Sequence, residues 1–223
     1  MGHKHNIVKK PWGYEYLAYE NDEVALWCLY IQKGHNTSMH CHPNKTTGLI
    51  LLDGNAEVSF LSNKFKLDPL NKIMIRKGLF HSTMATGERG AWVLEIEAPV
   101  DKHDLVRFKD SYGREGKPYE NSTFEYPKEE ACLWIEDSTD SEPRTYHIAN
   151  SELTVTKIDD ISFFDKVKQD TNIMFLQGGI VTEYNINVAG AGDIVAANNI
   201  SDLTKVFNKI KNNTMVMVMD KNV

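Results

Sequence analysis

Short apolar runs separated by turn clusters fill the N-terminal half of the chain and constrain its fold more than any other feature. Each run is four to eight residues long and rich in branched or aromatic side chains, as β-strands are. The clearest are Val24–Ile31, Leu49–Leu52, Ala56–Leu61 and Trp92–Glu97. Strands this short and regularly spaced, with no helical pattern among them, predict a β-sandwich or barrel.

Histidines follow a pattern on these predicted strands. His40 and His42 are two residues apart after Gly34, and alternate residues of a strand point to the same face. His81 follows a second glycine turn at Lys77-Gly78. Neutral imidazole is the commonest ligand for zinc, copper, iron and nickel, so these three histidines are the predicted metal ligands. The alternative is a metal-free barrel in which they serve as hydrogen-bonding residues.

Composition and charge exclude several classes of function. The formal net charge of -6 argues against nucleic acid as a partner, because phosphate binding needs a basic face. No apolar run approaches the roughly 18 residues of a membrane span, and the N-terminus lacks the apolar core of a secretory signal. The three cysteines have no paired spacing, as in reduced proteins. We therefore expect a cytoplasmic protein without nucleic-acid or membrane partners.

The chain divides into three parts. Residues 1–119 carry the histidine pattern, and residues 120–144 are acidic and rich in turn residues, which predicts a linker or surface excursion. An edge loop of one larger domain is the alternative. Residues 145–223 return to strand-like runs and contain one predicted helix, which Ser201 can cap. The apolar face of that helix would consist of Leu203, Val206, Phe207 and Ile210.

Three motifs occur in the order found in a known family. They are Pro-Trp-Gly-Tyr-Glu at residues 11–15, Gly34 with His40 and His42 followed by the glycine turn before His81, and Asp-Leu-Val-Arg-Phe at residues 104–108. In this order they resemble the cupin superfamily and, within it, the cupin domain of type II mannose-6-phosphate isomerases, which is often fused to mannose-1-phosphate guanylyltransferase. The resemblance covers roughly residues 8–115.

The resemblance implies an all-β, double-stranded β-helix, that is, a jelly-roll barrel. It also implies a divalent metal ion (zinc, iron, nickel or manganese), a sugar or sugar-phosphate ligand, and a homodimer. Residues 145–223 can then be a degenerate second cupin half, whose single histidine, His147, makes a second metal site unexpected. The chain departs from the family at Thr46 and Thr47, where a glutamate is usual. Threonine supplies neither an anionic ligand nor a carboxylate that moves protons.

Other residues are candidates for the site. Glu95 and Glu97 share one face of a predicted strand and can replace the missing carboxylate as metal ligand or general base, or lie in solvent. Arg107 can hold a substrate phosphate or carboxylate through its planar fork, or form a salt bridge with Asp104 or Asp110. Further candidates for substrate binding, with core or surface roles as alternatives, are Trp12, Tyr14 and His35.

Three functions are compatible with these residues. The first is a sugar-phosphate or nucleotide-sugar isomerase or epimerase, in which a metal ion polarises the substrate and a nearby base moves a proton. The second is a non-catalytic, sugar-binding cupin module. The third is an Fe(II) dioxygenase that holds iron with histidines alone.

Overall fold

Antiparallel strands build both parts of this chain. The computed structural model describes residues 7–101, 103–117, 132–138 and 142–221. Contacts divide the chain into two units, Met1–Trp134 and Ile135–Val223. The linker predicted at residues 120–144 lies largely outside the described residues, so the predicted domain boundaries stay a prediction.

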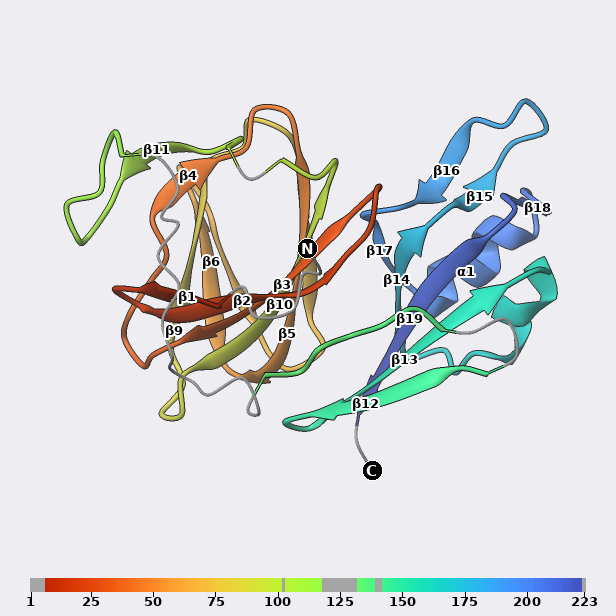
Figure 1. The fold of residues 1–223 in the computed structure, drawn as a ribbon, viewed down its shortest axis with the longest axis horizontal. Coiled ribbons are helices and arrows are strands. Elements are labelled where there is room, and N and C mark those ends of the chain that lie inside the picture. Colours follow the sequence, from red (N-terminus) through yellow and green to blue (C-terminus); the bar gives the residue numbers. More distant parts are fainter. Residues whose placement is uncertain (1–6, 102, 118–131, 139–141, 222–223) are drawn as a thin grey trace. The chain divides into compact units, whose positions relative to one another are not determined.

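Two sheets form the first unit, and they face each other as a barrel (Figure 1). The six-stranded sheet has the order β1 (Ile7–Lys10), β2 (Gly13–Glu20), β3 (Ala25–Ile31), β10 (Ala91–Ala98), β5 (Thr46–Gly54) and β8 (Lys72–Ile75). The five-stranded sheet has the order β11 (Val106–Lys109), β4 (Met39–Cys41), β9 (His81–Ala85), β6 (Ala56–Phe60) and β7 (Lys64–Leu67). This is the predicted all-β jelly-roll barrel.

Side-chain alternation decides what faces the interior of this barrel. Val93 of β10 belongs to the buried core with Trp27 and Leu29 of β3. Glu95 and Glu97 follow Val93 at alternate positions, so they point to the same side of the sheet. The interior of the barrel is therefore apolar over part of its length and carries acidic side chains over the rest.

Glycine is required at the turn between β5 and β6. Gly54 has φ +84°, and a Cβ atom there would lie 2.1 Å from the carbonyl oxygen of Gly90. Only glycine combines this left-handed backbone with so close an approach of another strand. The Asp53-Gly54 pair that the sequence predicts as a turn ends β5, and its glycine permits the close approach of Gly90, the residue before β10.

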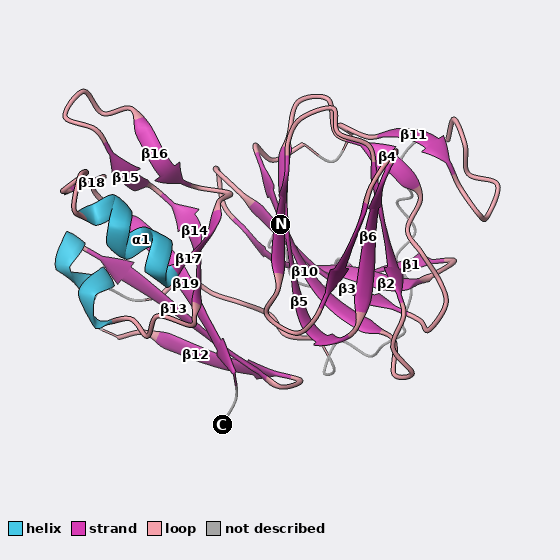
Figure 2. Cartoon of the chain, turned by 180° about the vertical axis from the view of Figure 1, so that it is seen from behind, coloured by secondary structure: helices cyan, strands magenta, loops and turns pink. Residues whose placement is uncertain are grey.

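A five-stranded and a three-stranded sheet form the second unit. The larger sheet has the order β12 (Arg144–Ile148), β13 (Ser151–Ile158), β19 (Thr214–Lys221), β14 (Asn172–Gln177) and β17 (Ile194–Ala196). The smaller has the order β16 (Asn187–Gly190), β15 (Gly179–Val181) and β18 (Lys209–Ile210). Figure 2 shows the unit's two helical segments in cyan, the 3₁₀ helix η2 (Ile161–Lys166) and α1 (Ala197–Thr204).

The predicted helix exists, but its predicted bounds are wrong. Helix α1 begins at Ala197 and ends at Thr204, so Ser201 lies inside it and is not its cap. Ile210, placed on the helix by the sequence pattern, belongs to β18, where it pairs with Ile180 of β15. Pairing with a strand therefore prevails over the helical spacing of the apolar residues.

Strand pairing follows the same order in both units. The sequence β2-β3-β10-β5-β8 in the first unit corresponds to β12-β13-β19-β14-β17 in the second, and β9-β6-β7 corresponds to β18-β15-β16. Strand β4 has no counterpart among residues 159–171, where η2 lies between β13 and β14. This match supports the expectation of a degenerate second cupin half. Among the described residues, no helix is long and apolar enough to cross a membrane.

Candidate metal site and the surrounding cavity

Two neighbouring strands bring the three predicted ligand histidines together. His40 on β4 is the register partner of His81 on β9, and His42 follows β4 by one residue. One ring nitrogen from each histidine lies within 4.8 Å of the corresponding atoms of the other two. This spacing suits nitrogen atoms that share one metal ion, since zinc–nitrogen bonds are about 2.0–2.1 Å long.

A backbone carbonyl orients each of the three rings through its Nδ1 atom. The pairs are His40 with Ser38 at 2.8 Å, His42 with Asp104 at 2.6 Å and His81 with Leu79 at 3.0 Å. A carbonyl oxygen only accepts hydrogen bonds, so each Nδ1 carries the proton and each Nε2 keeps its lone pair. Nε2 of His42 is buried and has no hydrogen-bond partner among the residues that the structure describes. A metal ion is the partner that this arrangement fits.

Burial also favours the uncharged form that metal binding requires. It is the main cause that lowers the pKa of His42 to about 3 and that of His81 to about 4. Burial likewise holds the pKa of His40 well below its ordinary value, and the neighbouring imidazoles lower it further. All three rings are neutral near pH 7, as ligands of a divalent metal must be.

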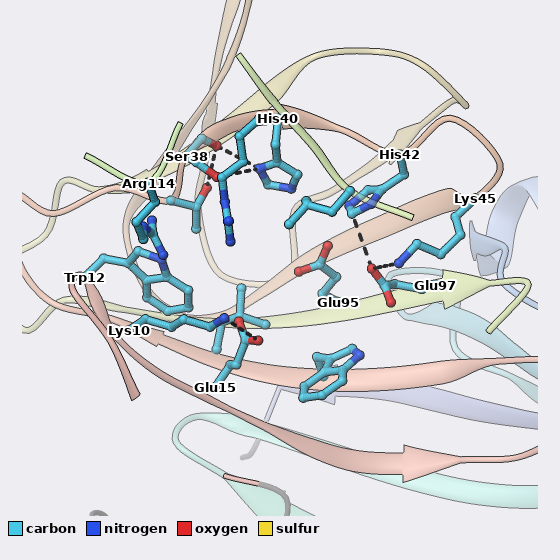
Figure 3. Close-up of a pocket in the computed structure, with 15 residues that line it drawn as sticks. Lys10, Trp12, Glu15, Ser38, His40, His42, Lys45, Glu95, Glu97 and Arg114 are labelled. Carbon is cyan, nitrogen blue, oxygen red and sulfur yellow. Dashed lines mark hydrogen bonds and ion pairs between the residues drawn. The ribbon is translucent and has the colours of Figure 1, made fainter. Parts of the chain in front are cut away.

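Glu97 lies beside the histidines and takes a place close to that of the family's usual glutamate. Glu97 on β10 is the register partner of Thr47 on β5, and directly opposed residues project from the same face. Its Oε1 atom is 3.7 Å from Nε2 of His42 and accepts a 2.7 Å hydrogen bond from Nζ of Lys45 (Figure 3). A carboxylate is thus absent at positions 46 and 47 but present opposite Thr47 on the adjacent strand.

Glu95 is the second carboxylate of the cavity and points into its centre (Figure 3). Burial is the main cause that raises its pKa, and the charge of Glu97 raises it further. Burial also raises the pKa of Glu97, while Lys45 opposes the rise. The two carboxyl groups therefore share a largely buried site, in which one of them holds a proton more readily than an exposed glutamate does.

Glu95 and Glu97 form a second group of potential ligands with His42. Both groups use the same ring nitrogen of His42, because its Nδ1 is occupied by the Asp104 carbonyl. One imidazole nitrogen binds one metal ion, so the two groups are alternative positions for a single ion. The geometry fits one metal ion with three nitrogen donors and a carboxylate close by.

Basic and aromatic side chains line the remainder of the cavity. Lys10 pairs with Glu15 at 3.3 Å, and both side chains are buried. Arg107 on β11 is the register partner of His40, next to the metal ligands. Trp12 also lines the cavity. An anion bound between these groups would lie beside the proposed metal ion.

Two residues that the sequence suggests for substrate binding lie elsewhere. Tyr14 packs against Tyr30 and Trp92, with ring centroids 5.4 and 6.0 Å away, on the face of β2 opposite to Glu15. His35 stacks on Tyr112, and its Nδ1 atom is 3.0 Å from the tyrosine hydroxyl. Neither is among the residues that line the cavity, and their roles in substrate binding stay predictions.

Sequence reasoning missed several residues of the site. Lys45 gave no signal, because a lysine after a histidine pair is ordinarily solvent-exposed. Asp104 was considered only as a salt-bridge partner of Arg107, yet its carboxylate accepts hydrogen bonds from the Asn44–Lys45 backbone. Lys10 and Glu15 flank the Pro-Trp-Gly motif, and they share a face because Lys10 pairs with Gly13, two residues before Glu15 on β2.

Known proteins match the same part of the chain that carries this site. Residues 1–110 match the family described as mannose-6-phosphate isomerase C-terminal. A mannose-1-phosphate guanylyltransferase from Klebsiella pneumoniae is 26% identical over 113 residues, covering 50% of this chain and 24% of that protein. The xanthan biosynthesis protein XanB from Xanthomonas campestris is 25% identical over 116 residues, covering 49% of this chain and 24% of that protein. The match thus spans about a quarter of these relatives.

A solved structure titled as a sugar phosphate isomerase of the cupin superfamily, from Silicibacter pomeroyi, is also similar. It has a TM-score of 0.39 and 9% identity, covering 43% of this chain and 64% of that one. The predicted motifs, the strand order and the family match all lie in the same part of the chain. Over residues 1–110, the first unit of this chain therefore resembles the mannose-6-phosphate isomerase C-terminal family of cupins.

Proposed function

We propose that the first unit is a metal-dependent enzyme of carbohydrate metabolism that isomerises or epimerises a sugar phosphate or nucleotide sugar. The observation that carries the proposal is the shared orientation of His40, His42 and His81, whose Nδ1 atoms all donate to carbonyls and leave their Nε2 lone pairs available. Two carboxylates, those of Glu95 and Glu97, lie close to the ring of His42. Such a site can hold a metal ion and move a proton.

Each residue has a separate task in this mechanism. A divalent metal ion, when bound, would polarise a carbonyl or hydroxyl oxygen of the sugar. In an isomerisation, Glu95 accepts the proton from the carbon next to the carbonyl and returns it on the same face to the carbonyl carbon, while the hydroxyl proton passes to the carbonyl oxygen, so no proton is gained or lost overall. An epimerisation needs a second acid on the opposite face to return the proton. The raised pKa of Glu95 suits a group that must both accept and donate a proton near neutral pH.

Glu97 serves as the anionic partner of the metal ion, and Lys45 fixes its orientation. Arg107 holds the phosphate or carboxylate of the substrate, and Trp12 contacts the sugar ring. The identity of the metal ion, the homodimer and the cytoplasmic location stay predictions.

Exchange of protons with solvent tests the reaction. Wild-type protein, loaded with each candidate metal ion, is incubated with a panel of hexose and heptose phosphates in deuterated water. We expect deuterium in the product, with Glu95→Gln lowering turnover at least 100-fold, as removal of a general base does. The control is Tyr14→Phe, which lies outside the cavity. Absence of turnover across the panel, with retained sugar binding, would instead establish a binding module.

A carboxylate exchange tests the role of Glu97. Glu97→Thr should weaken metal binding about 10- to 100-fold. Adding Thr47→Glu to the same chain returns a carboxylate from the opposite residue of the ladder and should recover part of the loss. If the double variant binds metal no better than Glu97→Thr, a carboxylate at position 47 cannot replace that of Glu97, and the two positions are not equivalent for metal binding.

The ion pair between Lys45 and Glu97 also supports the dioxygenase alternative. If the lysine keeps Glu97 away from the metal ion, histidines alone are the ligands, as that reaction uses. Oxygen consumption by the Fe(II)-loaded protein with small thiols or diketones distinguishes the two reactions. Native protein that contains zinc alone would rule the dioxygenase out.

A further inference from the structure

The three histidines differ in what orients them. His40 and His81 each donate to a carbonyl two residues earlier in their own strand segment, Ser38 and Leu79 respectively. His42 donates to the carbonyl of Asp104, which lies 62 residues further along the chain. His40 and His81 also pair directly across β4 and β9, whereas His42 lies beyond the end of β4. The position of His42 therefore depends on a distant segment.

Asp104 is attached to the loop after His42 by its side chain. Its Oδ2 atom accepts hydrogen bonds from the backbone N–H groups of Asn44 at 2.8 Å and Lys45 at 2.9 Å. Its Oδ1 atom accepts a 3.0 Å hydrogen bond from the side-chain amide of Asn44. Asp104 is buried, so these charge-assisted bonds are shielded from water. The carboxylate fixes the loop to the segment that carries the carbonyl for His42.

The same loop delivers Lys45 to the cavity. The Lys45 backbone is held by Asp104, and its ammonium group donates to Glu97 at 2.7 Å. One residue outside the metal ligands thus controls both a histidine ligand and the cation that orients the carboxylate.

We propose that Asp104 is a positioning residue of this site, which clamps the His42–Lys45 loop so that Nε2 of His42 and the ammonium group of Lys45 face the cavity. The expected effect on metal affinity rests on the proposed metal function. The orientation of His42 and Lys45 can be tested in the protein without metal. Partners of this kind beyond the ligands typically change metal affinity 10- to 100-fold.

Histidine tautomers in the metal-free protein provide the first readout. Long-range ¹H–¹⁵N correlation on ¹⁵N-histidine-labelled protein shows which ring nitrogen carries the proton. In the wild type we expect His40, His42 and His81 all protonated at Nδ1. In Asp104→Ala the signals of His42 alone should change to a mixture of tautomers. A merely structural role would alter all three histidines or none.

Cobalt binding gives the second readout. We expect Asp104→Ala to weaken Co²⁺ binding about 10- to 100-fold and to change the visible d–d spectrum of the bound ion. Asp104→Asn keeps an acceptor oxygen and a similar shape but removes the charge, so its Co²⁺ affinity should lie between those of the wild type and Asp104→Ala. Asp193→Ala is the matched control, because this half-buried carboxylate also accepts a backbone N–H bond, from Gly190, but lies in the second unit. It should leave the cobalt spectrum unchanged.

The outcomes separate the two proposals. If His42 keeps its tautomer and the cobalt Kd stays within twofold in Asp104→Ala, Asp104 is not a positioning residue, whatever the protein catalyses. If the wild type binds no Co²⁺ but Asp104→Ala still changes the His42 tautomer, the positioning role stands and the metal function falls. Should Asp104→Ala fail to fold, the tautomer of His42 in Asp104→Asn decides, and the wild-type pattern there overturns the proposal.

Discussion

The two units share an order of strand pairing but fill the same place in the chain differently. Between β3 and β5 of the larger sheet, the chain of the first unit forms β4 with His40. Between the corresponding strands of the second unit, β13 and β14, it forms the helix η2. Phe164 of η2 packs into a core with Phe175 and Ile200. Where one unit presents imidazoles to a polar cavity, the other encloses an apolar core. A fold of this kind can hold a ligand in its interior only where apolar side chains leave a cavity.

The largest effect expected from this comparison concerns metal binding. His81→Ala should abolish tight binding of Zn²⁺ or Co²⁺, because it removes one of three converging nitrogen donors. His147→Ala, at an exposed position of the second unit, should change nothing. Metal analysis should give one ion per chain. Two ions per chain, or unchanged binding by His81→Ala, would break the distinction between the units.

Apolar packing should account for the stability of the second unit. Phe164→Ala should lower the free energy of unfolding by about 3–5 kcal/mol, because it empties a buried position. The half-buried Phe163 next to it offers a matched control, and Phe163→Ala should cost less. Urea unfolding gives the energies, and cobalt titration should show no change in either variant. Loss of metal binding in Phe164→Ala would show that the site depends on η2.

In the cavity of the first unit, stability should depend on the pairing of buried charges and not on apolar packing. Lys45→Met leaves Glu97 buried without its cation, which should cost about 3–5 kcal/mol at neutral pH. The exposed pair of Lys64 with Glu57 is the control, and Lys64→Met should cost about 1 kcal/mol or less. Adding Glu97→Gln to Lys45→Met removes the unpaired charge and should restore most of the loss.

The cost of Lys45→Met should also depend on pH. Burial already raises the folded-state pKa of Glu97, and loss of Lys45 raises it further. A carboxyl whose pKa is higher in the folded than in the unfolded state stabilises the protein at low pH, and this contribution disappears as pH rises toward the folded pKa. Urea unfolding of the metal-free variant should therefore show a smaller deficit near pH 5 than near pH 8. A deficit independent of pH would mean that Glu97 has found another partner.

The comparison also explains how far the sequence can predict each unit. The strand lengths and the three histidines are local patterns, and the sequence predicts both. The tie between Asp104 and the loop at Asn44 joins residues 60 positions apart and leaves no local pattern. Tyr14 and Glu15 are neighbours on one strand, so only one of them can face inward. The usual preference places the aromatic residue inside, but this cavity is polar and takes the glutamate.

The smallest expected effect has opposite signs in the two units. Thr47 in the first unit has a buried hydroxyl that finds no hydrogen-bond partner within the described part of the chain. Thr214 in the second donates to the carbonyl of Lys211 at 2.6 Å and accepts from the N–H of Gly179 at 3.1 Å. Valine has nearly the same shape, so Thr47→Val should stabilise the metal-free protein by about 1 kcal/mol, while Thr214→Val should destabilise it by about 1–3 kcal/mol.

Urea unfolding in the presence of a chelator measures both threonine variants. If Thr47→Val also destabilises the protein, the Thr47 hydroxyl forms a hydrogen bond in solution and is not an unpaired buried group. If Thr47→Val stabilises the protein but weakens cobalt binding, the unpaired hydroxyl is kept for the metal site at the expense of stability. The two units would then differ in a second way besides the replacement of β4 by η2: the first keeps a buried polar group unpaired for its site, whereas the second pairs it.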